Sequence, residues 1–144
     1  MTMSFVLDLQ AFATKAGAKA DLVVKRVVAG MAESVIEMSP VGDATYWKNP
    51  APKGYLGGRF RANWDYGFNA VPGKQFDTAD KTGATSINRI LSGFSGKPAV
   101  GIHYLANNLP YAIRLENGWS RQAPVGMVGV TVLKFQALVR SAAQ

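Results

Sequence analysis

One stretch near the start of the chain decides the predicted fold: residues 4–38, which read SFVLDLQAFATKAGAKADLVVKRVVAGMAESVIEM. Apolar residues recur along it at spacings of three and four, which places them on one side of an α-helix. The positions of this stripe are Phe5, Leu9, Phe12, Ala16, Ala20, Val23, Val27 and Met31. Several valines lower the intrinsic helix propensity, because a branched Cβ crowds the preceding turn. We therefore expect packing against other elements to hold this helix in place.

Long loops separate this helix from the shorter elements that follow. The Ser39-Pro40 pair ends the helix, because the residue before a proline is driven out of the α-helical region. Residues 41–58 and 70–86 are rich in the residue types that are typical of turns and loops. The second loop is open to two interpretations, a flexible segment or a projecting hairpin arm.

Two segments have the alternating pattern of β-strands. Residues 59–68 predict a half-buried strand, with one apolar face and one polar face. Its apolar face comprises Phe60, Ala62, Trp64 and Tyr66, and its polar face comprises Arg59, Arg61, Asn63 and Asp65. Residues 97–104 predict a second strand, in which Val100, Ile102 and Tyr104 alternate with Gly101 and His103.

Three further helices are expected, at residues 85–91, at residues 111–116 and from residue 125 onward. Pro110 suits the first turn of the second of these, and Gly118 ends it. An extended conformation over residues 127–132 is an alternative for the start of the last helix. Together the elements predict a single α+β domain, residues 1–144. In this domain a long N-terminal helix and further helices pack on a small, mainly antiparallel sheet.

The charge of the chain is positive and unevenly distributed. The formal net charge is +7, and from Ser86 to the end Glu116 is the only acidic residue. A basic half-chain is typical of proteins that contact nucleic acid or an acidic protein surface. A solvated surface that only keeps the protein in solution is the alternative, since no dense run of lysine and arginine is present.

The sequence contains no motif of enzymes, metal sites or cofactor sites. Cysteine is absent and His103 is the only histidine, which excludes thiolate chemistry and cysteine-ligated zinc. We expect Asp77 and Asp80 to be solvated loop residues. No apolar run reaches the roughly 18 residues that span a bilayer, and the first residues do not have the pattern of a signal peptide. The prediction is a protein made in the cytoplasm, with no catalytic residue, no cofactor, no metal and no membrane contact.

Aromatic residues in the first long loop and in the first strand each allow two interpretations. Tyr46, Trp47 and Tyr55 either fold back over the core of their own domain or dock on a neighbouring subunit. The aromatic residues of the strand would suit stacking with single-stranded nucleic acid. However, they alternate with Arg59 and Arg61, so that the two kinds of side chain point to opposite faces. Packing of the aromatic face in the core is therefore favoured.

Two groups of residues, taken in order, resemble the signature of a phage protein family. The first is Ser39-Pro40-Val41 followed by Gly58-Arg59-Phe60-Arg61-Ala62-Asn63-Trp64. The second is Asn108-Leu109-Pro110-Tyr111-Ala112, then Leu115-Glu116-Asn117-Gly118, then Ser120, Gln122-Ala123-Pro124, Gly126-Met127-Val128 and Thr131. The pattern resembles that of the gene-ten-like tail components of lambdoid long-tailed phages, also called tail-completion or neck proteins. Simpler members pass almost directly from Ser-Pro-Val into the glycine-arginine segment, whereas residues 42–57 intervene here.

This resemblance implies a structural role in the virion. Members of the family lie between the head portal complex and the tail tube and are expected to form a sixfold ring. The implied partners are further copies of the chain, a head-completion or connector protein, and a tail terminator or tail tube protein. Genomic DNA would pass through the ring and make transient, non-specific contacts. A basic nucleic-acid-binding module and a small phage nuclease are the alternative functions.

The residues expected at contacts come from the loops and from the polar side of the first strand. The candidates for a subunit or partner interface are Tyr46, Trp47, Tyr55, Arg59, Arg61, Glu116, Gln122 and Pro124. Arg59 and Arg61 are also the candidates for facing the lumen and the DNA. We expect Pro110, Tyr111, Glu116 and Gly118 to define an element of the fold more than to contact a partner.

Overall fold

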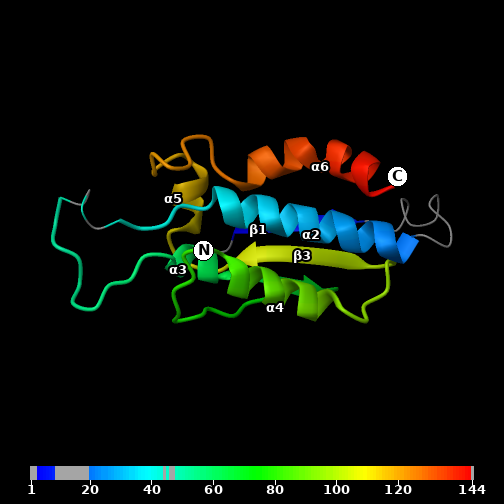
Figure 1. The fold of residues 1–144 in the computed structure, drawn as a ribbon, viewed down its shortest axis with the longest axis horizontal. Helices are drawn as coiled ribbons and strands as arrows, with labels where there is room; N and C mark the ends of the chain where they lie inside the picture. Colours follow the sequence, from blue (N-terminus) through cyan, green and yellow to red (C-terminus); the bar gives the residue numbers. More distant parts are fainter. Residues whose placement is uncertain (1–2, 9–19, 44, 46–47, 144) are drawn as a thin grey trace.

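The computed structural model describes residues 3–8, 20–43, 45 and 48–143, and its architecture confirms the predicted α+β class. The order of elements is β1 (Met3–Asp8), α2 (Ala20–Met38), α3 (Arg59–Ala62), β2 (Trp64–Phe68), α4 (Ala84–Phe94), β3 (Ile102–Asn107), α5 (Ala112–Glu116) and α6 (Val128–Ala142). Figure 1 shows α6 lying along α2, and the sheet and α4 below α2. The loop between α2 and α3 extends away from the body at the left of the view.

The sheet has three antiparallel strands in the order β1-β3-β2. In β1, Met3 pairs with Asn107 of β3, and in β2, Trp64 pairs with the same residue from the other side. The prediction of one helix over residues 4–38 is therefore wrong at its start, where the chain forms β1. Six residues are too few for apolar spacing to distinguish a strand from a helix, and pairing with β3 decides the outcome. Residues 9–19 lie outside the described part of the chain.

The apolar face of α2 forms the centre of the core, as its stripe predicts. Val23, Val27 and Met31 are buried. The face is wider than predicted, because Val24, Val28, Ala32, Val35 and Ile36 are fully buried as well. It packs with residues of the sheet, α4 and the N-terminal end of α6, including Trp64, Ile90, Leu105 and Met127. Burial of one such side chain stabilises the fold by about 1.5–3 kcal/mol. This burial outweighs the low helix propensity of the valines.

Residues 59–68 form a helical turn and then a strand, so the prediction of one continuous strand is wrong. Gly58 has a φ of +103°, and the helical turn α3 follows it directly. The predicted inner positions are nonetheless buried at Phe60, Ala62 and Trp64. Arg59 and Arg61 consequently lie on a helical turn and not on the polar face of a strand.

Side-chain hydrogen bonds hold the loop of residues 69–83 against the rest of the fold, so the loop is not a projecting hairpin. The amide of buried Asn63 accepts a hydrogen bond from Phe76 N (2.7 Å) and donates one to Phe76 O (2.9 Å). The amide of Asn108 donates to Pro72 O at 2.7 Å. Asp80 is buried and accepts hydrogen bonds from the backbone N–H groups of Gly83 and Ser86, at the start of α4. The expectation that Asp80 is a solvated loop residue is therefore wrong, because it caps a helix.

The remaining helices agree with the sequence in type and differ in their ends. The helix α4 is longer than the predicted residues 85–91, and α5 nearly matches residues 111–116. The helix α6 includes most of residues 127–132, so the extended alternative for that stretch is wrong. The strand predicted at residues 97–104 is shifted to β3, whose inward residues are His103 and Leu105.

His103 is a buried part of the core. Its Nδ1 lies 2.7 Å from the Tyr66 hydroxyl and its Nε2 lies 3.2 Å from Ala99 O. Because a carbonyl only accepts, the neutral ring donates from Nε2 and accepts the Tyr66 proton at Nδ1. The ring also stacks on Tyr66 and contacts the Phe68 and Phe94 rings. Burial lowers the pKa of His103, and the Ala99 hydrogen bond partly opposes this effect.

The protein should lose stability as the pH falls below about 6.5, the pKa of histidine in an unfolded chain. There the unfolded chain binds a proton that the folded chain, with its lowered pKa, does not bind. NMR titration of the only histidine should give a pKa below that value, and His103→Asn should reduce the pH dependence of the urea midpoint between about pH 5 and 7. A His103 pKa above 6.5 in the folded protein would contradict this description.

Candidate interaction site

The residues that carry the family resemblance come together at one end of the fold. Ser39, directly after α2, is buried; it donates a hydrogen bond to Val35 O (2.5 Å) and accepts one from the Trp64 indole (2.7 Å). The end of α2 is thereby joined to the first residue of β2. Both partners are removed from water, so loss of either would leave the other unsatisfied, at a cost of about 1–3 kcal/mol.

Arg61 joins three parts of the chain through its guanidinium group. It donates to Glu37 O (2.9 Å) and Ser39 O (2.8 Å) at the end of α2, and to Lys81 O (2.7 Å) in the loop before α4. The last carbonyl groups of a helix lack partners within the helix, and a planar guanidinium can serve several acceptors at once. Arg61 therefore closes the C-terminal end of α2 and positions α3 and residue 81 against it.

Gln122 and Val41 pair like neighbouring residues of two strands. Val41 N donates to the Gln122 side-chain oxygen (2.9 Å), and the Gln122 amide nitrogen donates to Val41 O (2.8 Å). This pair joins the segment after α2 to the segment before α6. The two segments are 81 residues apart in the sequence.

Glu116 closes the N-terminal end of α6. Its carboxylate accepts from the backbone N–H groups of Met127 (2.8 Å), Val128 (2.9 Å) and Gly129 (2.9 Å). These N–H groups have no acceptor within the helix, and a carboxylate is favoured at the positive end of the helix dipole. A Cβ atom at Gly126, whose φ is +81°, would lie 2.7 Å from the Glu116 carboxyl carbon. The position therefore requires glycine.

The structure thus divides the predicted contact residues into two groups. The side chains of Arg61, Glu116 and Gln122 hold the fold together through backbone groups. Tyr55 and Arg59 line a groove, and Pro124 is exposed. Tyr46 and Trp47 lie outside the described residues.

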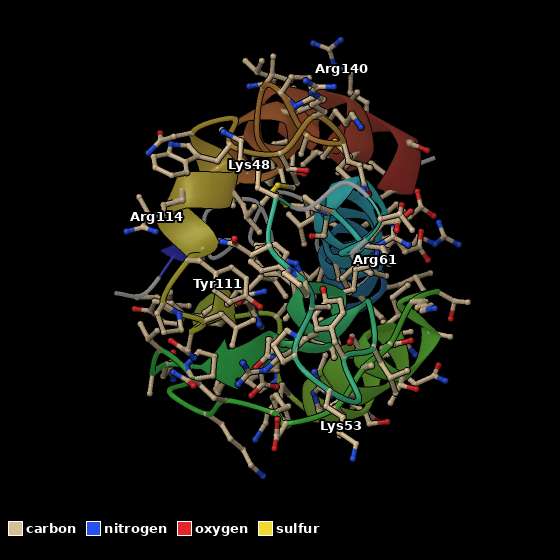
Figure 2. The ribbon with its side chains drawn as sticks, turned by 90° about the vertical axis from the view of Figure 1, so that its left-hand side faces the viewer. Lys48, Lys53, Arg61, Tyr111, Arg114 and Arg140 are labelled. Carbon is tan, nitrogen blue, oxygen red and sulfur yellow. The ribbon has the colours of Figure 1, made fainter. Side chains whose placement is uncertain are left out.

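The groove, which we call the end groove, lies at the same end of the molecule and has a volume of about 710 Å³. Three segments line it, one after α2, one around α3 and one after α5. The lining residues are Pro40, Val41, Gly42, Asp43, Tyr55, Arg59, Phe60, Leu115, Trp119, Ser120, Arg121 and Gln122. Gln122 thus contributes both to the fold and to this surface. Figure 2 views the molecule from this end, with Lys48, Arg61, Tyr111 and Arg114 labelled.

Trp119 is an exposed aromatic residue at this end, and it is not among the contact residues predicted from the sequence. Its relative exposure is 72%, and the Arg114 guanidinium lies 5.1 Å from its ring centroid. Leu56 and Val125 are also mainly exposed. Exposed large apolar side chains beside a groove are typical of surfaces that bind other proteins. The sequence indicates this exposed position, because Trp119 directly follows Gly118, the residue that ends α5.

Between Gly42 and Gly57 the described residues (42–43, 45 and 48–57) belong to an excursion whose two ends meet. A Cβ atom at Gly57 would collide with Gly42 O, so the two glycines allow the chain to close there. Figure 1 shows this segment, in cyan to green, projecting beyond the body of the fold. We call it the arm. Its ends lie together, so the chain can accommodate it without disturbing the elements on either side.

Replacement of Arg61 tests its structural role against a role that needs only positive charge. Arg61→Ala should lower the free energy of unfolding by about 1–3 kcal/mol, because the carbonyl groups of Glu37, Ser39 and Lys81 lose their charged donor. Arg61→Lys keeps the charge, but its single nitrogen cannot replace the Nε, Nη1 and Nη2 donors that reach three separate carbonyl groups, so it should recover less than half of this loss in urea denaturation. Full stability of Arg61→Lys would contradict the structural role. Arg121→Ala, in the end groove, is the matched control and should change stability by about 0.5 kcal/mol or less.

The described residues contain no group of three or more His, Cys, Asp or Glu side chains that could hold a metal ion. Among them, no helix is long and apolar enough to cross a membrane. Comparison with family models, curated proteins and solved structures finds no match to this chain.

Proposed function

We propose that this chain is a structural subunit of the neck of a long-tailed bacteriophage. In this proposal about six copies form a ring at the head–tail junction, between a head-completion or connector protein and a tail terminator or tail tube protein. The ring completes the tail or joins it to the head and leaves a passage for DNA. The protein is made in the host cytoplasm and ends in the virion.

One observation carries this proposal: the separated segments that resemble the neck-protein signature form one connected network. Ser39 contacts Trp64 and Arg61, Val41 pairs with Gln122, and Glu116 caps α6. Short matches that arose by chance would have no reason to meet in space. Their meeting supports the interpretation that the segments specify one fold, and the resemblance connects that fold with the neck.

The surfaces also support a role in assembly. A closed ring requires two different patches on each subunit. The arm provides a projection that can reach a neighbouring subunit. On the outer side of α6, Val132 and Leu133 are 44% and 84% exposed, and they provide a separate apolar patch.

The positions of the basic residues argue against a dedicated nucleic-acid surface. Arg61 and Arg89 donate to backbone carbonyl groups, and Arg89 also lies beside Asp65. Lys97 lies beside the start of α2, whereas Arg121 lies near the end of that helix, in the end groove. A charge spread in this way suits transient, non-specific contact with passing DNA better than binding along one stripe.

Phage lacking this gene should produce filled heads and finished tails that do not join, or tails of abnormal length. Negative-stain electron microscopy of the lysate gives this result directly, and the gene supplied in trans should restore infectious particles. Normal infectious virions in the absence of the gene would contradict the proposal. Loss of a metal-dependent nuclease activity together with normal particle morphology would support the nuclease alternative instead.

A further inference from the structure

We infer that the end groove binds a short acidic segment of another protein, one that also carries a large apolar side chain. The inference deepens the proposed function and rests on it for the identity of the partner, a protein adjoining the ring. The binding chemistry itself follows from the side chains that line the groove.

The apolar side chains of the groove suit an apolar anchor. Tyr55, Phe60 and Leu115 line it. Trp119 lines it as well, with most of its surface exposed to water. Pockets that combine apolar walls with a few polar groups are typical binding sites, and aromatic anchors dominate binding at protein interfaces. Covering Trp119 would remove a large apolar surface from water.

The charges of the groove select an acidic segment. Arg59 and Arg121 line it, and a second hollow of about 490 Å³, which shares Val41, Gly42, Asp43, Tyr55 and Gln122 with it, reaches Lys81. Asp43 is the only carboxylate among the lining residues of both hollows. The hydroxyl (2.7 Å) and N–H (3.0 Å) of Thr45 donate hydrogen bonds to this carboxylate, lower its pKa and keep it ionised. The two hollows still carry more positive than negative side chains, because Arg59, Arg121 and Lys81 face a single carboxylate.

Arg59 is available to a partner even though an acidic residue lies near it. Its Nε is 4.0 Å from Asp77 Oδ1, and the two side chains are 43% and 101% exposed. An exposed pair at this distance contributes little to stability, so a carboxylate of the partner can take the place of Asp77. Guanidinium groups bind carboxylates with paired hydrogen bonds, which gives orientation as well as affinity.

The charges of the arm also make it unlike the acidic segment that we infer for the end groove, so the arm of a second copy is not the expected occupant. Among the described arm residues the charged side chains are Asp43, Lys48 and Lys53, a net positive set. Insertion of such an arm would bring like charges together in the groove. A different protein with an acidic segment meets the charge requirement.

The test uses the whole chain and designed probe peptides. A fluorescein-labelled 12-residue peptide of alternating Glu and Phe is the acidic probe, and the same peptide with Lys or Ser in place of Glu provides two controls. Fluorescence anisotropy should show binding of the acidic probe that weakens with salt, and at least tenfold weaker binding of both controls. The double variant Arg59→Glu/Arg121→Glu should weaken binding of the acidic probe at least tenfold. Lys25→Glu/Lys97→Glu, with the same change in net charge away from the groove, should leave it within about twofold.

Circular dichroism and thermal unfolding should show that both double variants fold. Trp119→Ala tests whether the groove takes part in binding the acidic probe, without any change in charge. Equal binding of the acidic and basic probes, or unchanged binding by Arg59→Glu/Arg121→Glu, would overturn the inference. So would displacement of the acidic probe by an oligothymidylate at equal concentration, which would assign the groove to nucleic acid.

Complementation of phage lacking the gene separates this inference from the proposed function. If the deletion blocks the joining of heads to tails and Arg59→Glu/Arg121→Glu fails to restore it, both the proposed function and this inference are supported. If the double variant restores it fully, the groove has no role in assembly and the inference fails. If the deletion has no effect on particles while peptide binding remains selective, the proposed function alone fails.

Discussion

The hydrogen bonds donated by the Arg61 guanidinium hold the architecture together. They satisfy carbonyl groups at the end of α2, the helix that forms the centre of the core, and they fix residue 81 against the same point. Ser39 is positioned there, and Ser39 in turn accepts the Trp64 hydrogen bond that places β2. Asp80 at α4 and Glu116 at α6 satisfy helix ends in the same way, from outside each helix. A chain with short elements and long loops thus obtains fixed geometry from side-chain to backbone contacts.

Such contacts with the backbone explain why several polar residues at one end of the fold do not form a binding site for a partner. Arg61 and Glu116 are charged, yet each is bound to backbone groups of its own chain. The surfaces left for partners are the arm and the end groove, where Arg59, Arg121 and Trp119 have no such structural task. A firmly held frame with exposed loops at one end suits a protein whose role is to contact others.

The sequence predicted the α+β class and the apolar face of α2, because these follow from local periodicity. It also predicted the burial of Phe60, Ala62 and Trp64, although Phe60 and Ala62 lie on the helical turn α3 and not on the predicted strand. It did not predict β1, since pairing with a strand about 100 residues later determines that conformation. Nor could local patterns show that Asp80 caps α4 or that Arg61 reaches Glu37, because both depend on how loops fold back. The end groove was missed for the same reason, as three separate segments build it.

Cryo-electron microscopy of the neck of the intact virion would show whether this chain forms the ring at the head–tail junction. We expect a ring between the head portal and the tail tube whose repeating density fits this fold, with α2 and α6 side by side and the arm directed at a neighbouring protein. Density for adjoining protein in the end groove would accompany it. If other proteins filled the whole neck and no density fitted this chain, the chain would not be a neck subunit.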